Sequence, residues 1–132
     1  MTYGLDTSVL MRLLNRTNDD YVQRISARIN ALLAAGDDFF ISEVVVSEIY
    51  FALQHHYGYS KAEAIMALRA IEASPGFSFS PEAAAALATP DAWKANPGFV
   101  DRMIVNGYAA RGHVTLSCEK DFRRLDLTEV IS

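Results

Sequence analysis

Acidic side chains interrupt apolar stretches of this chain at places far apart in the sequence. Asp6 lies in the stretch GLDTSVL, Glu48 in VVVSEIYF and Asp101 in FVDRMI, while Glu119 and Asp121 follow a short apolar segment near the C-terminus. Burying a carboxylate is costly unless the group is paired or binds a metal. Each acid considered alone could instead be a helix cap or one half of an ion pair, with no role in metal binding. Because such acids recur in four separate segments, we predict that they bind one cation together.

The donor set predicts which cation this would be. Neighbouring carboxylates raise one another's pKa, and a divalent ion removes that conflict. Oxygen donors favour Mg²⁺, with Mn²⁺ as a substitute, over zinc. Zinc sites are usually built from several Cys and His side chains, and this chain has only one cysteine and three histidines, so zinc is not favoured. The predicted metal ligands are Asp6, Glu48, Asp101 and Glu119. Such a site is typical of phosphodiester hydrolysis.

The elements that must position these acids alternate between short strands and longer helices. Apolar periodicity and turn residues predict strands at about 2–5, 39–41, 77–79 and 114–117, with a last one near 130–131, and helices at about 8–14, 20–35, 43–56, 61–73, from 81 onward and 99–110. Ser42 is a predicted helix cap, and Ser60 with Glu63 has the spacing of a capping box. Strands separated by helices predict an α/β fold with a mainly parallel sheet flanked by helices. We expect one domain spanning residues 1–132.

This architecture predicts where the site lies. Ligands of open parallel sheets bind beyond the carboxyl ends of the strands. Asp6 ends the first predicted strand, and Glu119 and Asp121 follow the strand at 114–117. At about 100° per residue, Glu48 and Asp101 share helix faces with apolar residues and are predicted to point inward. The acids are therefore expected to converge at one edge of the sheet.

Composition limits the class of protein. The 132 residues carry a net charge of −4, so nucleic-acid binding would need a local basic patch. Arg102, Lys120, Arg123 and Arg124 are the predicted RNA-contacting residues because they lie close in sequence to the acids, and Arg12 and Arg16 are further candidates. The single cysteine and the lack of a long apolar stretch predict a cytoplasmic protein without a membrane span.

Four motifs in order along the chain resemble the PIN-domain ribonucleases. They are LDTSVL at the N-terminus, SEIY after the second predicted strand, FVDRMI on a late helix and SCEKDF near the C-terminus. Their positions and the chain length are similar to VapC-type toxins of bacterial toxin–antitoxin pairs. The resemblance implies a PIN-like three-layer fold and a Mg²⁺-dependent endoribonuclease toxin. It also implies a homodimer that acts on RNA and is held inactive by a cognate antitoxin.

The resemblance assigns roles to residues of this chain. Asp6, Glu48 and Asp101 match the first three acidic positions, and Ser8 matches a hydroxyl position that supports the site. The fourth acid is open between Glu119 and Asp121, since many relatives have Asp where this chain has Glu119. All five acids are therefore candidate catalytic residues.

Two other classes of protein remain open. In a phosphatase-like enzyme, Asp6 would attack phosphorus, but such enzymes commonly carry a second Asp two residues later, where this chain has Ser8. A non-catalytic PIN-like scaffold would bind RNA or a partner without cleaving it. Intact acids at the first three positions favour the enzyme.

Overall fold

The computed structural model describes residues 1–15 and 19–132, so the candidate Arg16 lies outside the described residues. The elements are β1 (Thr2–Gly4), α1 (Thr7–Leu14), α2 (Asp20–Ala34), β2 (Asp38–Ile41), α3 (Glu43–Tyr57), α4 (Lys61–Ala73), β3 (Phe77–Phe79), α5 (Pro81–Leu87), α6 (Phe99–Ala110), β4 (Thr115–Ser117), the 3-10 helix η1 (Lys120–Arg124) and β5 (Thr128–Val130). The predicted alternation of helices and parallel strands is confirmed. The sequence did not predict η1, and the last strand begins earlier than expected.

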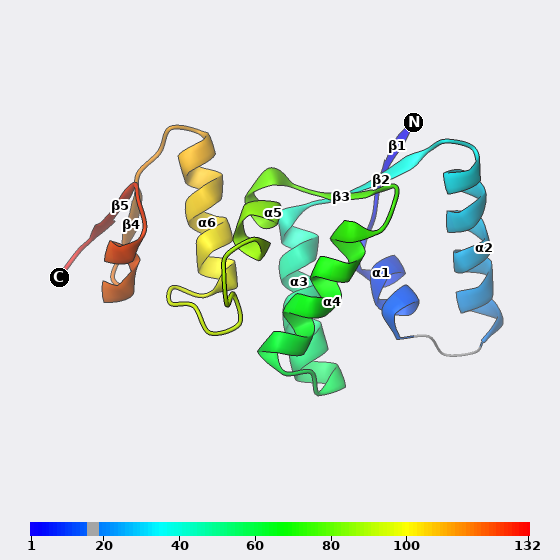
Figure 1. Ribbon diagram of the computed structural model, residues 1–132, viewed down its shortest axis with the longest axis horizontal. Coiled ribbons are helices and arrows are strands. Elements are labelled where there is room, and N and C mark those ends of the chain that lie inside the picture. Colours follow the sequence, from blue (N-terminus) through cyan, green and yellow to red (C-terminus); the bar gives the residue numbers. More distant parts are fainter. Residues whose placement is uncertain (16–18) are drawn as a thin grey trace.

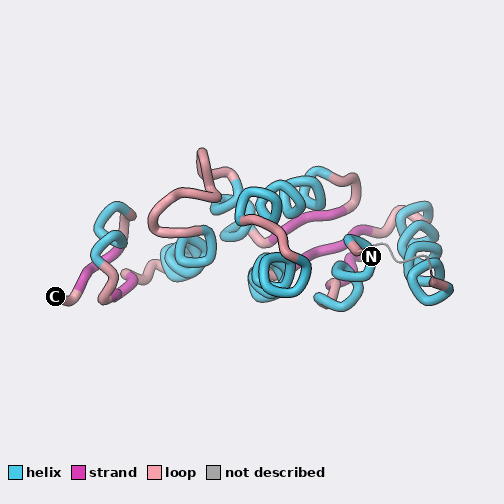
Figure 2. The backbone as a smooth tube through the Cα atoms, turned by 90° about the horizontal axis from the view of Figure 1, so that it is seen from below, coloured by secondary structure: helices cyan, strands magenta, loops and turns pink. Residues whose placement is uncertain are grey.

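A three-stranded parallel sheet organises the N-terminal part of the chain. Its order is β1-β2-β3, with Tyr3 opposite Phe39 and Phe39 opposite Phe77. Helices lie on both sides of these strands (Figure 2). Local signals begin α3 and α4 where the sequence predicted. The Ser60–Glu63 capping box is present, and the Ser42 hydroxyl accepts a hydrogen bond from the Val45 N–H at 3.4 Å.

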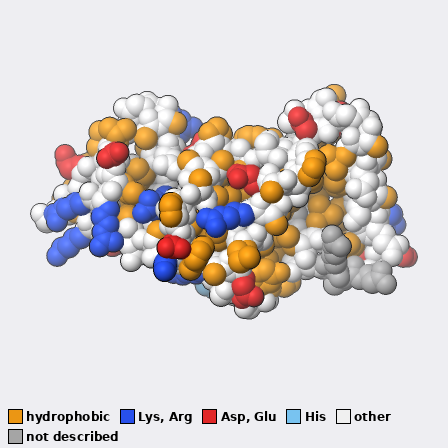
Figure 3. All heavy atoms as spheres, viewed as in Figure 1, with side chains coloured by type: hydrophobic (Ala, Val, Ile, Leu, Met, Phe, Trp, Pro, Cys, Tyr) orange, Lys and Arg blue, Asp and Glu red, His pale blue; other side chains and the backbone are white. Residues whose placement is uncertain are grey.

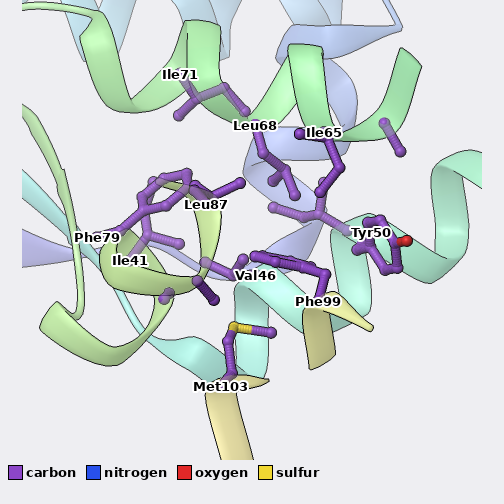
Figure 4. Close-up of a cluster of buried hydrophobic side chains, with 14 of the residues drawn as sticks. Ile41, Val46, Tyr50, Ile65, Leu68, Ile71, Phe79, Leu87, Phe99 and Met103 are labelled. Atoms are coloured by element: carbon purple, nitrogen blue, oxygen red, sulfur yellow. The ribbon is translucent and has the colours of Figure 1, made fainter. Parts of the chain in front are cut away.

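The main core forms between this sheet and helices α3 to α6. Ile41, Ile49, Leu53 and Leu68 are fully buried in it. Phe99 and Met103 extend this core into α6 and lie beside Val46 and Tyr50 of α3 (Figure 4). The rings of Tyr50 and Phe99 meet edge to face, with centroids 5.0 Å apart. These contacts hold α6 against the body of the molecule.

The C-terminal lobe, which we define as residues 115–130, contains a second sheet. Its strands β4 and β5 are parallel and pair with each other alone among the described residues. Where the sequence predicted one sheet, the strands thus form two. The lobe lies at one end of an elongated molecule, beyond α6, whereas β1 lies on the other side of α3 (Figure 1). The chain turns into the lobe at Gly112, whose φ of 75° favours glycine.

Candidate functional site

Two of the predicted acids act on a third, Asp101, where the lobe meets α6. Burial raises the pKa of the Asp101 carboxyl above its ordinary value, and the negative charges of Asp121 and Glu119 raise this pKa further. Asp101 and Asp121 are half-buried, and Glu119 is exposed. The 3-10 helix η1 produces this arrangement, because it places Glu119 at its N-cap and Asp121 in its first turn. The Asp101 carboxyl therefore lies within electrostatic range of two acids from a distant segment.

Basic side chains lie next to these acids. Lys120, Arg123 and Arg124 are exposed on η1. Lys and Arg side chains gather over the lobe, at the left of Figure 3. Arg124 Nη1 donates to the Asn96 carbonyl oxygen at 3.4 Å, and this contact ties the lobe to the loop before α6. This patch is a local concentration of positive charge on a chain whose net charge is −4.

The other basic candidates have structural contacts. Arg102 Nε donates to the Pro97 carbonyl oxygen at 2.8 Å and so holds the start of α6. The Arg12 guanidinium lies 5.0 Å from the centroid of the Tyr21 ring, between α1 and α2. Both guanidinium groups therefore have partners within the fold.

Asp6 lies at the carboxyl end of β1, as predicted, but its side chain is exposed. The residue is the N-cap of α1. The Ser8 hydroxyl donates to Asp6 Oδ2 at 2.7 Å. This hydrogen bond, together with the backbone N–H groups of Thr7 and Ser8, lowers the pKa of Asp6 below its ordinary value. Asp6 is thus held ionised by the turn that follows β1.

Glu48 does not point into the core, and the predicted inward orientation is wrong. Its side chain is exposed and lines a groove of about 500 Å³ between α3 and α6. The helix face that we judged apolar is only partly covered, since Val44 and Phe51 on it are also exposed. The prediction failed because helical periodicity identifies a face but does not say whether another element covers it.

The groove contains two acids that the sequence analysis did not select. Glu43 and Glu82 line it together with Glu48, and Arg111, which directly follows α6, completes its charged lining. Both new acids lie in the first turns of their helices, α3 and α5. First-turn acids are common for helix stability, so this signal alone does not indicate a site.

A larger hollow of about 910 Å³ lies between α1, α2 and α4. Its lining is mainly apolar, with Leu10, Leu13 and Ile71 among its residues, and none of the described lining residues is charged. The volume of a hollow therefore does not identify the candidate functional site, and the carboxylates remain that candidate.

The chemistry of the acidic donors fits Mg²⁺ or Mn²⁺, because Asp101, Glu119 and Asp121 offer carboxylate oxygens and the charges of Asp121 and Glu119 oppose ionisation of Asp101. The arrangement, however, is incomplete. Residues 1–15 and 19–132 contain no group of three or more His, Cys, Asp or Glu side chains close enough to hold a metal ion. Neither Asp6 nor Glu48 is among the charges that raise the pKa of Asp101.

Comparison with known proteins places the chain in a family. The model of the PIN domain matches residues 3–127. The chain belongs to the PIN domain family. As a PIN domain, it also resembles a chain in the crystal structure of VapBC2 from Rickettsia felis bound to a DNA fragment from their promoter, with 16% sequence identity and a TM-score of 0.41 over 99% of this chain and 98% of that chain. No curated protein matches the chain significantly.

Within this PIN domain, no described helix is long and apolar enough to cross a membrane.

Proposed function

We propose that this PIN domain is a Mg²⁺-dependent endoribonuclease. The observation that carries the proposal is Asp101, whose charge is opposed by Asp121 and Glu119 beside the exposed cations of η1. Lys120 and Arg123 would bind backbone phosphates, and the acids would hold the cation. Bound Mg²⁺ would supply positive charge to the phosphodiester oxygens during hydrolysis. Asp6 and Glu48 are the remaining ligands that the family resemblance assigns.

The decisive experiment is cleavage of total cellular RNA in Mg²⁺ and in EDTA. We expect discrete products with the wild-type protein in Mg²⁺ and none in EDTA. Asp101→Asn should lower the cleavage rate by at least about 100-fold, because even outer groups of metal sites contribute factors of this size. Asp126→Asn is the matched control, since it removes an exposed acid of the same lobe that does not perturb Asp101. Cleavage by Asp101→Asn at the wild-type rate would refute the site assignment.

We further propose that the nuclease is the toxin of a toxin–antitoxin pair, as its resemblance to VapC-type toxins implies. An antitoxin would bind the toxin and keep it inactive. Expression of the chain without a cognate antitoxin should arrest growth of the host, and Asp101→Asn should relieve the arrest. Normal growth with the wild-type chain at matched expression would contradict this role.

A non-catalytic RNA-binding scaffold is the second candidate. The lack of three gathered ligands among the described residues favours it. The same RNA distinguishes the two, because a scaffold would retain RNA in a filter-binding assay and leave it uncut in Mg²⁺. Charge reversal of the patch by Lys120→Glu with Arg123→Glu should weaken binding under either proposal.

A further inference from the structure

One hydrogen bond joins the C-terminal lobe to the rest of the described residues. Arg124 Nη1 donates to the Asn96 carbonyl oxygen at 3.4 Å, and no other hydrogen bond or ion pair of the described part of the chain links residues 115–130 to those before them. The buried Phe122 of the lobe belongs to neither apolar cluster of the body. The lobe therefore has few restraints on its position, and the Arg124 contact is one of them.

The acceptor of this hydrogen bond lies in a firmly held loop. Pro97 is fully buried, and its carbonyl oxygen accepts from Arg102 Nε at 2.8 Å. The Gly98 carbonyl oxygen accepts from the Arg102 backbone N–H at 3.0 Å. Asn96 therefore presents its carbonyl oxygen from a segment that is fixed to the first turn of α6, where Asp101 lies.

The donor lies on the same face of η1 as one of the acids. In a 3-10 helix, side chains three residues apart lie above one another. Asp121 and Arg124 have this spacing, so the face of η1 that carries Arg124 also carries Asp121. After burial, the charge of Asp121 is the largest cause of the raised pKa of Asp101. This face of η1 is therefore directed towards the start of α6.

The two other cations of η1 lie on a different face. Lys120 and Arg123 are also three residues apart, and both are exposed. Neither side chain has a hydrogen bond or ion pair within residues 1–15 and 19–132. Their charges are open to a ligand, whereas the guanidinium group of Arg124 is directed into the fold. The short helix thus separates its cations by face.

We propose that Arg124 is a positioning residue of the acidic site and does not contact RNA. Its hydrogen bond to Asn96 sets the lobe against the start of α6 and so brings the acids of η1 to Asp101. The two other cations of η1 provide the phosphate contacts. This division of roles rests on the proposed ribonuclease function, whereas the hold of Arg124 on the lobe does not.

The chain contains a natural pair of probes for the position of the lobe. Trp93, the only tryptophan, lies between α5 and α6, and Cys118, the only cysteine, is exposed in the lobe. A dye attached to Cys118 can accept excitation energy from Trp93 in the metal-free protein. Arg124→Gln should lower the transfer efficiency, because the lobe loses its hydrogen bond to the loop before α6.

Arg123→Gln is the matched control for this measurement. It removes the same charge from the other face of η1 and should leave the energy transfer unchanged. Both arginines are exposed, so neither substitution should unfold the protein, and circular dichroism checks this. Equal energy transfer in Arg124→Gln and the wild type would overturn the proposal.

The affinity for Mn²⁺ alone separates positioning from the effect of charge. Removing a cation beside carboxylates makes the local potential more negative, so charge by itself predicts tighter Mn²⁺ binding in both variants. Positioning predicts the opposite for Arg124→Gln, because its acids no longer share one ion. We expect an EPR titration to show at least about 10-fold weaker binding, as for groups that orient metal ligands. Arg123→Gln should not weaken binding. Equal or tighter binding by Arg124→Gln would overturn the positioning role.

The kinetics of RNA cleavage test the division of roles. Arg123→Gln should mainly raise KM, because it removes a contact to the bound substrate, whereas Arg124→Gln should mainly lower kcat. A raised KM with unchanged kcat in Arg124→Gln would show an RNA contact and overturn the proposal. If the wild type binds no Mn²⁺ and cleaves no RNA, the ribonuclease proposal fails, and the energy-transfer comparison still decides whether Arg124 holds the lobe.

Discussion

The body of the molecule and its C-terminal lobe bury their side chains very differently. In the body, Ile49 and Leu53 are fully enclosed between the sheet and its helices. In the lobe, Phe122 is the only large apolar residue that is buried among the described residues, and Leu116 is 61% exposed. The body can therefore fold on its own apolar contacts, whereas the lobe depends on what it packs against.

The same contrast separates the acids. Asp6 belongs to the body, where a hydroxyl and backbone N–H groups stabilise its charge. Asp101 faces the lobe, where burial and two neighbouring carboxylates oppose its charge. A bound cation stabilises an ionised carboxylate most where the surroundings disfavour its negative charge. A cation bound near the lobe would therefore relieve the opposed charge of Asp101, whereas the charge of Asp6 is already stabilised.

The largest expected effect comes from matched leucine truncations in the two regions. Leu53→Ala in the body should lower the free energy of unfolding by about 2–5 kcal/mol, because it leaves a cavity in a closed core. Leu116→Ala in the lobe should change it by less than about 0.5 kcal/mol at protein concentrations where the chain is monomeric. Urea denaturation of both variants measures the difference. Equal losses would show that the lobe is packed as tightly as the body.

A smaller effect is expected from Asp101→Asn as the pH changes. Because the pKa of Asp101 is raised in the folded protein, the fold binds this proton more tightly than the unfolded chain does. Ionisation therefore destabilises the fold as pH rises from the ordinary value of 3.8 through the raised pKa. The variant should be more stable than the wild type at neutral pH, and this gain should vanish well below pH 3.8. Thermal unfolding across pH without metal tests this sign; a gain that persists in acid would contradict it.

The smallest expected effect is at Asp6. Ser8→Ala removes the hydroxyl that donates to the carboxylate, so the pKa of Asp6 should rise towards its ordinary value of 3.8. The lowered pKa stabilises the fold above 3.8, and this contribution is lost as pH falls through the folded pKa. Carboxyl NMR titration measures the shift. Ser117→Ala is the control, because that hydroxyl accepts from the Glu119 N–H and should leave the pKa of Asp6 unchanged.

Local sequence signals predicted most of the elements. Ser60 and Glu63 begin α4 as a capping box, and Pro81 begins α5 at a position that tolerates proline. The short helix η1 carries no comparable signal, since it has no side-chain cap and its five residues are too few for an apolar period to repeat. Glu48 shows the limit of periodicity, because exposure of α3 depends on which element covers each face.

The sequence by itself determined the order of strands and helices, the oxygen-rich set of acids and the placement of Asp6 at the end of β1. These features follow from neighbours within a few residues. The tertiary structure alone decided which acids influence one another, because the position of the lobe against α6 lets Asp121 and Glu119 raise the pKa of Asp101. It also decided that β4 pairs with β5 and leaves the edge of β1 open. Strand pairing depends on which distant edges come together, and no local pattern in the chain specifies that choice.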